Sequence, residues 1–364
     1  MTRTFRAPFF QKNDEVGVNI AERLPELAQL ETLIQTHAGH RPDEMRAEKL
    51  LDIHYQSQNF PIYECRLGNP APGLPCLFLV GGVHGLERIG TQVLLSLLSS
   101  LCARQKWDIS LQRSLQQMQI IAIPLLNPVG MAMQWRSNAQ HVDLMRNAPV
   151  DSVEKTAWLV GGHRFSRKIP WYRGKANAPM EAEAQLLVDR VITQSKHSRF
   201  MIALDCHSGF GVKDRIWFPY AKSKQTPVSH LGSIFQLRNM FFQAYPHQNY
   251  VFEPQTKHYT CHGDLWDYLY DQITAHGRTL LPLTLEMGSW LWVRKNPLQL
   301  WHPLGLFHPL KKHRVERTLR KHLVLLDFLI NATEAYTNWF SHDPQGEHWQ
   351  QAHSLWYRDN FQES

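Results

Sequence analysis

The run Cys76-Leu-Phe-Leu-Val-Gly81-Gly-Val-His84-Gly-Leu-Glu87 carries the strongest fold signal in this chain. Residues 76–81 form a short apolar run that ends in glycines, which predicts a buried β-strand. Residues 88–103 follow with apolar side chains at helical spacing, so we expect the strand to lead directly into a helix. A histidine and a glutamate lie in the connection between the two.

Strand and helix patterns go on alternating through the rest of the chain. Such an alternation is typical of a sheet whose parallel strands are joined by helices on both faces. We therefore predict an α/β fold of three layers, α/β/α, in which a single mixed, mostly parallel sheet is flanked by helices. The further strands are expected at 118–126, 200–206, 215–220 and 279–285, and the further helices at 182–193, 231–245, 265–273 and 315–330.

The composition predicts a folded protein with a large core. The 364 residues are 43% hydrophobic and 20% charged, which excludes a disordered chain and a disulfide-stapled mini-protein. We expect one main domain over residues 59–332. An N-terminal extension over 1–58, with a helix at 17–38, precedes it, and a C-terminal tail over 333–364 without clear periodicity follows it.

The sequence shows no sign of a membrane partner or of secretion. Its richest apolar stretch, residues 74–83, is far shorter than the roughly 18 residues of a membrane helix. The first residues lack the apolar core of a secretory signal. Five cysteines, an odd number without paired short spacings, are expected to be reduced thiols. We therefore predict a cytoplasmic protein.

The formal net charge of +7 could attract anionic partners. Basic residues are scattered except for a dense run at residues 311–321, which lies on a helical pattern. We interpret this run as a solvated helix face. No nucleic-acid-binding module is recognisable, so no nucleic-acid partner is predicted.

Two pairs of residues in the chain have the spacing His-x-x-Glu. His84 and Glu87 follow the apolar strand at 76–81, whereas His313 and Glu316 lie within the basic helix. In open α/β sheets, ligands bind beyond the carboxyl ends of the strands. The first pair occupies such a place, and the second is expected to be an exposed helical surface.

Two further strands end in residues that can bind a metal or carry a proton. The strand at 200–206 leads into His207, and the strand at 279–285 leads into Glu286. Two histidines and one glutamate leave an open position for water, which is the arrangement of catalytic zinc sites. We therefore expect one Zn²⁺ per chain on His84, Glu87 and His207, with Glu286 as the general base.

The segment from Trp135 to Asn147 contains two arginines, Arg136 and Arg146. One guanidinium could stabilise the oxyanion of a tetrahedral intermediate, and the other could bind a substrate carboxylate with a pair of hydrogen bonds. On composition alone, surface salt bridges are the alternative interpretation. The residues themselves do not decide between these roles.

Taken together, these motifs resemble the zinc metallocarboxypeptidase (peptidase M14) family over about residues 76–290. The His-x-x-Glu pair, the Trp-Arg step, the segment Val142-Asp-Leu-Met-Arg-Asn147, the strand-end Asp-x-His-Ser and the glutamate before Met-Gly stand in the family's order. The resemblance implies zinc on the three residues above, Glu286 as general base, Arg136 polarising the scissile carbonyl and Arg146 binding the terminal carboxylate. Met145 departs from the family, which usually has asparagine there.

The resemblance also implies residues that would contact substrate. Tyr259 is the best candidate for the family's mobile tyrosine, and Tyr268 is a poorer one. Asn147 is a candidate substrate contact and is expected to order its loop. The specificity pocket can be aligned in two ways: Asp264 would favour a lysine or arginine side chain, and Leu265 would favour an apolar one. Cys206 is expected to be packed in its strand and not to be a ligand.

The leading hypothesis is a zinc hydrolase that cleaves an amide bond next to a free carboxylate, most simply a carboxypeptidase acting on short or modified peptides. An N-acyl amino acid deacylase of the aspartoacylase-like branch would use the same metal set. A non-catalytic binding module on this fold is the third hypothesis. The partner is thus a peptide or an N-acyl amino acid, and the oligomeric state is left open.

Overall fold

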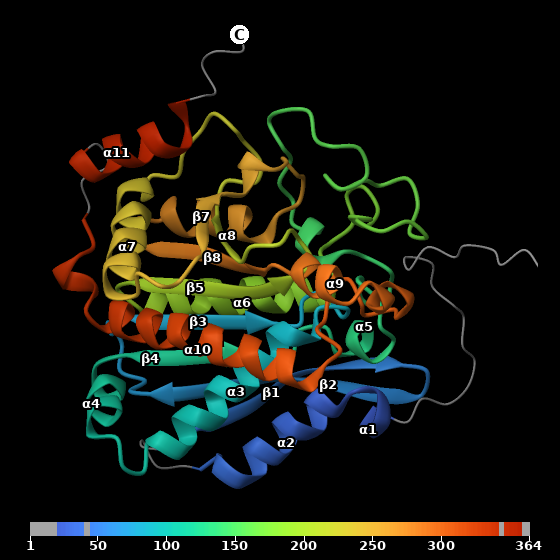
Figure 1. Ribbon diagram of the computed structural model, residues 1–364, viewed down its shortest axis with the longest axis horizontal. Helices are drawn as coiled ribbons and strands as arrows, with labels where there is room; N and C mark the ends of the chain where they lie inside the picture. The colour runs from blue at the N-terminus through green and yellow to red at the C-terminus, as the bar shows by residue number, and fades with distance from the viewer. Residues whose placement is uncertain (1–19, 40–43, 342–345, 359–364) are drawn as a thin grey trace, which may run out of the picture.

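A computed structural model describes residues 20–39, 44–341 and 346–358. It contains one mixed sheet of eight strands in the order β1-β2-β4-β3-β5-β8-β6-β7 (Figure 1). The predicted α/β fold with a single sheet flanked by helices is confirmed. The strands are β1 (Arg46–Tyr55), β2 (Gln58–Gly68), β3 (Cys76–Gly81), β4 (Gln119–Ile123), β5 (Met201–Ser208), β6 (Arg215–Phe218), β7 (Val251–Pro254) and β8 (Leu280–Met287).

The centre of the sheet places the functional residues. Strands β4, β3, β5 and β8 run parallel to one another, so their carboxyl ends meet at one edge. The strands β3 and β5 are buried along their whole length, as expected for parallel strands covered on both faces. In the pairing of β5 with β8, His207 lies directly beside Glu286. The topology alone therefore brings these two residues together.

Helices cover both faces of the sheet. One face carries α3 (Arg88–Arg104), α7 (Leu231–Ala244) and α10 (Lys312–Glu334), which pack into the larger hydrophobic core; α3 and α10 lie in front of the sheet in Figure 1. The opposite face carries α6 (Ala182–His197) and α8 (Leu265–Thr274). The remaining helices are α1 (Ile20–Arg23), α2 (Pro25–His37), α4 (Ile109–Gln117), α5 (Pro128–Ala132), α9 (Trp290–Lys295) and α11 (Glu347–Trp356), with 3₁₀ turns η1 (Leu144–Arg146), η2 (Gln255–Lys257), η3 (Pro297–Trp301) and η4 (Tyr336–Asn338).

Part of the segment that the sequence suggests as an extension belongs to the sheet. Residues 46–55 form the edge strand β1, which pairs with β2, and α2 packs against α3. Residues 1–19 and 40–43 of the expected extension lie outside the described residues, as do 342–345 and 359–364 of the expected tail. Within the tail, α11 packs against α7, and the buried Trp356 indole donates a hydrogen bond to Phe252 O at 2.9 Å. The domain boundaries themselves stay a prediction.

No helix within the described part of the chain is both long and apolar enough to cross a membrane. The basic run at 311–321 lies at the start of α10, and most of its cationic side chains are exposed. The helix expected there from the sequence is therefore confirmed, with solvent on its basic face.

Candidate metal and catalytic site

The carboxyl ends of β3, β5 and β8 bring four chemically active residues together. His84 lies in the turn after β3, Glu87 stands at the start of α3, and His207 and Glu286 lie near the ends of β5 and β8. Gly90 makes this approach possible, because a Cβ there would lie 2.2 Å from Cys206 O. Only glycine lets α3 pack this closely on β5, and so carry Glu87 to His207.

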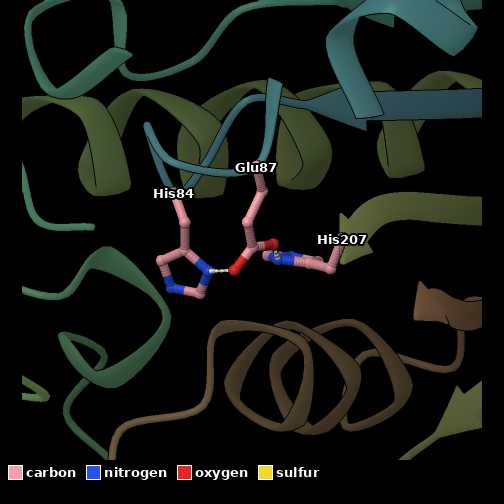
Figure 2. Close-up of side chains that lie close together, drawn as sticks. All are labelled: His84, Glu87 and His207. Carbon is pink, nitrogen blue, oxygen red and sulfur yellow. Dashed lines mark hydrogen bonds and ion pairs between the residues drawn. The ribbon is translucent and has the colours of Figure 1, made fainter. Parts of the chain in front are cut away.

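His84, Glu87 and His207 form a compact donor set (Figure 2). The Glu87 carboxylate lies between the two rings, with Oε1 2.9 Å from His84 Nδ1 and Oε2 2.9 Å from His207 Nδ1. One ligand atom from each residue lies within 4.8 Å of the other two, and all three side chains are buried. The three residues that the sequence predicts as metal ligands thus meet at one point.

Two buried aspartates contact the far side of the histidine rings. Asp143 Oδ1 lies 3.0 Å from His84 Nε2, and Asp205 Oδ2 lies 2.9 Å from His207 Nε2. Carboxylates in this position fix the ring's tautomer and orientation, so that Nδ1 faces a metal. Sequence reasoning assigned neither role. The available signals were an aspartate two residues before His207 and one in the arginine-bearing segment.

The charges of the donor set fit a divalent cation. Burial opposes ionisation of Glu87, but positive charge on the two histidine rings, together with their hydrogen bonds, holds the pKa of Glu87 below its usual value. A bound cation would take over this positive charge. A metal requires this ionised carboxylate together with neutral rings. Two imidazole nitrogens and one carboxylate oxygen are a donor set that zinc accepts with a position left open for water. The residues present therefore fit zinc.

The residues that the sequence analysis set aside do not join the donor set. His313 and Glu316 lie on α10, away from the donor set. The Cys206 side chain is buried in the core, and burial raises the pKa of its thiol. The interpretations of the second pair as helix surface and of Cys206 as packed strand agree with these positions.

Glu286 lies beside the donor set without belonging to it. The residue is 7% exposed, and its Oε1 accepts a hydrogen bond from Phe210 N at 3.0 Å. Burial, helped by the negative charge of Glu87, raises the pKa of Glu286 to about 8. A carboxyl group with a pKa near neutrality can both accept and return a proton.

Arg136 packs directly against the donor set. Its Nη1 donates to Glu87 Oε1 at 3.2 Å, and its Nε donates to Asp143 Oδ2 at 2.9 Å. The guanidinium thus forms two salt bridges, but with buried carboxylates and not at the surface.

Arg146, on η1, lines the same cavity. It is 3% exposed, and its Nη2 donates to the Tyr259 hydroxyl at 3.3 Å. Its Nη1 donates to Met145 O at 3.1 Å, which fixes the direction of the guanidinium. Burial raises the pKa of Tyr259 to about 12, so this phenol is neutral and can donate a hydrogen bond. Tyr268, the poorer candidate, lies on α8, where it packs against the smaller hydrophobic core.

Asp264 and Leu265 have different surroundings. Asp264 begins α8, and its Oδ1 accepts hydrogen bonds from Trp266 N and Asp267 N at 3.0 and 3.1 Å. Asp264 lines the cavity, and its Oδ2 is buried without a hydrogen-bond partner within the described residues. Leu265 is fully buried in the core. Of the two residues that the alternative alignments would place in the specificity pocket, Asp264 lines the cavity and Leu265 does not.

Asn147 points away from the cavity. Its Nδ2 donates to Arg173 O at 3.0 Å, and its Oδ1 accepts from Glu181 N at 2.6 Å. Both amide atoms are used to tie distant loop segments together. The expected role in ordering the loop agrees with these contacts, whereas substrate contact, the other expectation for Asn147, has no support from them.

The donor set, both arginines and Glu286 line a single cavity of about 500 Å³. Aromatic and aliphatic side chains form the rest of its walls. A cavity of this size with a few convergent polar groups is typical of a small-ligand site. The walls are formed by Met145, Val160, Trp171, Phe210, Trp217, Tyr259, Trp290 and Phe307, among others.

Comparison with known proteins identifies the family. A profile of the zinc carboxypeptidases matches residues 19–290. The chain belongs to this family. The family is zinc-dependent, in agreement with the donor set. The matched region includes every predicted site residue and stops at the first residue of α9.

Relatives with curated names match shorter parts of the chain. Carboxypeptidase SOL1 from Arabidopsis thaliana is 31% identical over 108 residues, which are 29% of this chain and 22% of that protein. Carboxypeptidase D from Anas platyrhynchos is 24% identical over 169 residues, which are 45% of this chain and 11% of that protein. The chain therefore spans less than a quarter of the length of these relatives.

Solved structures show the same fold. Thrombin activatable fibrinolysis inhibitor aligns with 89% of this chain and 78% of its own, with a TM-score of 0.61 and 17% identity. Carboxypeptidase A from Helicoverpa armigera aligns with 85% of this chain and 72% of its own, with a TM-score of 0.58 and 16% identity. At these identities the likeness establishes the fold and no more.

Proposed function

We propose that this protein is a zinc-dependent carboxypeptidase that removes the last residue of short or modified peptides. The observation that carries the proposal is that one cavity holds a metal donor set, a carboxyl group with a raised pKa and a buried arginine. Arg146 supplies a buried positive charge in the wall of this cavity, to which a terminal carboxylate would bind. An enzyme that acts in the middle of a chain has no use for such a charge.

Each residue then has a defined task. Zinc, bound by His84, Glu87 and His207, would supply a polarised carbonyl and an activated water. Glu286 takes the proton of the attacking water and passes it to the leaving amine. Arg136 stabilises the charge that develops on the carbonyl oxygen, because its Nη2 makes no hydrogen bond among the described residues. Arg146 and Tyr259 hold the substrate carboxylate.

The same cavity suggests a side-chain preference. Asp264 offers a buried carboxylate oxygen without a partner in the described chain, whereas Leu265 belongs to the core. A cationic side chain entering the cavity would satisfy this oxygen. We therefore favour a terminal lysine or arginine over an apolar residue, and Asp264→Leu should reverse the order of preference.

We also favour the cytoplasm, as the sequence suggests. All five cysteines are free and buried. Burial raises the thiol pKa of four of them besides Cys206, namely Cys65, Cys76, Cys102 and Cys261. Unpaired thiols are usual in a reducing compartment. Fractionation of cells that express the full chain would test this.

A peptide-library digestion tests the activity. The zinc-loaded protein is incubated with the library, with and without chelator, and the products are identified by mass spectrometry. Loss of single C-terminal residues that stops with chelator supports the proposal. Release of acyl groups from N-acyl amino acids, with peptides left intact, would establish the deacylase instead. Zinc content without turnover of either class would favour the non-catalytic binding module.

A further inference from the structure

A second cleft lies between α9, α10, the loop that follows α7 and the segment around Asp214. Its volume is about 660 Å³, larger than the catalytic cavity. Both helices lie on the front of the molecule in Figure 1. The α9 and α10 residues of its lining lie beyond residue 290, outside the part matched by the family profile. The lining is strongly basic, with Lys295, Arg314, Arg317, Arg320 and Lys321 facing one carboxylate, Asp214.

The positive charge of the cleft is poorly compensated. Lys321 Nζ contacts Asp214 Oδ2 at 2.5 Å and so uses the only carboxylate among the described residues of the lining. Arg317 and Arg320 are exposed and form no ion pair within the described chain. Arg314, Arg317 and Lys321 stand on one side of α10, where like charges three and four residues apart destabilise a helix. A bound anion would remove this repulsion.

We propose that this cleft binds a compact anion that carries two or more phosphate groups. Several guanidinium groups around one concavity favour phosphate, which they contact through paired hydrogen bonds. The lining carries five cationic side chains and one carboxylate, Asp214, so its net charge is positive. Because the attraction grows with the charge of the ligand, a multiply charged anion gains most from this lining. Four segments of the chain enclose the cleft, which suits a small ligand better than a polymer. An inorganic polyphosphate and a nucleoside triphosphate share this chemistry.

The cleft and the catalytic cavity share a wall. Trp290, at the start of α9, lines the catalytic cavity, and its Nε1 donates to Gly209 O at 3.0 Å. From the cleft side, Arg314 Nη1 donates to Trp292 O at 2.9 Å. Asp214 Oδ1 accepts from Gly288 N at 2.7 Å, two residues beyond Glu286. An anion bound to Arg314 or Lys321 would therefore contact side chains that hydrogen-bond or pair with the segment next to the catalytic cavity, through Trp292 O or through Asp214. Anion binding itself does not rest on the proposed function.

Calorimetric titration of the full, zinc-loaded chain with inorganic triphosphate tests the proposal. The variant Arg317→Gln/Arg320→Gln removes two exposed charges without touching a buried contact. Lys168→Gln/Lys196→Gln also removes two exposed charges, from residues outside the cleft, and is the matched control. Because charge-assisted hydrogen bonds are among the stronger polar contacts, the double variant should bind triphosphate at least about tenfold more weakly than the parent. The control should bind like the parent, and affinity should fall as salt rises.

Three outcomes would overturn the proposal. The first is the absence of triphosphate binding at millimolar concentration, and the second is equal binding by all three proteins. The second would indicate binding at the zinc, which triphosphate chelates equally in every variant. The third is a single-stranded oligonucleotide that binds more tightly than triphosphate and still binds the double variant, which would indicate a broader nucleic-acid surface. Titration with a nucleoside triphosphate separates the two sources: equal affinity means that phosphates alone are recognised, and higher affinity means that the nucleoside also contacts the cleft.

Discussion

The pairs His84 and Glu87, and His313 and Glu316, have the same spacing and different surroundings. The first pair spans the turn from β3 into α3, where both side chains are buried and meet His207. The second pair lies on one regular helix, where neither residue is buried. Spacing sets which two side chains can approach each other. Burial and a third ligand from a distant strand make the difference between a metal site and a helix surface.

Metal binding should distinguish the two pairs most sharply. We expect the purified protein to hold close to one zinc per chain. His84→Ala or His207→Ala should lose this zinc and, with it, nearly all peptidase activity, because two ligands cannot hold the metal as three do. Metal analysis after dialysis measures the effect, with His313→Ala as the matched control. Loss of zinc from His313→Ala alone, or equal zinc in all three variants, would show that the site lies elsewhere.

Glu286→Gln should have the next largest effect. We expect kcat to fall by roughly 10² or more, as for loss of a general base, while zinc stays bound. Glutamine keeps an oxygen that can accept from Phe210 N, so the loop geometry is preserved. Steady-state kinetics and zinc content measured on the same sample separate the two properties. A parent-like kcat would mean that another group takes the proton of the water.

Arg146→Ala should weaken use of peptides with a free terminal carboxylate. A guanidinium pairing with a carboxylate contributes roughly 1.5 to 3 kcal/mol, so kcat/KM should fall about tenfold or more. Arg146→Lys should not restore it, because an ammonium cannot reproduce the paired hydrogen bonds. The measurement compares each peptide with its C-terminal amide. If Arg146→Ala leaves the acid-to-amide ratio of the parent unchanged, Arg146 does not bind the carboxylate.

Met145→Asn should act in the opposite direction and more weakly. Methionine has only a thioether to offer a carboxylate, whereas the amide group of asparagine can donate hydrogen bonds. We expect a few-fold rise in the kcat/KM ratio of free-acid to amidated peptides. Met145→Leu is the control, because it changes the side chain without adding a donor. Equal ratios in the two variants would exclude a contribution from this position.

The stability of the zinc-free protein should depend on pH through Glu286. Its pKa is about 8 in the folded protein against 4.5 in the unfolded chain. A raised acid pKa gives stability that is fully present below about pH 4.5 and is lost as pH rises through about 8. Relative to Glu286→Gln, the parent should therefore lose a few degrees in Tm between these pH values. Parallel Tm curves in chelator would contradict the raised pKa.

Several elements were not predictable from the sequence because their patterns are weak. Strand β1 lies at the edge of the sheet and is only half-buried, so its charged residues hide the alternation that marks a strand. The turn that joins it to β2 uses Gln56 and Ser57 at positive φ, without the glycine or asparagine that usually signals a hairpin. Helix α11 lies in a segment whose polar and aromatic residues show no clear helical period. Its packing against α7, which the local sequence does not record, places it in the fold.

The strand ends and the chemistry that they carry follow from the amino-acid sequence alone. Buried parallel strands have strong local patterns, and the residues that follow them meet at one edge of the sheet. His84, Glu87, His207 and Glu286 could therefore be grouped from their positions in the chain. The physical reason is that each strand has its own local pattern, and parallel pairing brings the carboxyl ends of these strands to the same edge of the sheet.

The directions of the loop side chains, in contrast, depend on how distant segments pack. Asp143 and Asp205 lie behind the histidine rings, and Asp264 lines the cavity. The basic cleft beside α10 likewise forms only where four separate segments of the chain come together. No local period records these contacts, because they form between residues far apart in the chain, and so only the folded arrangement determines them.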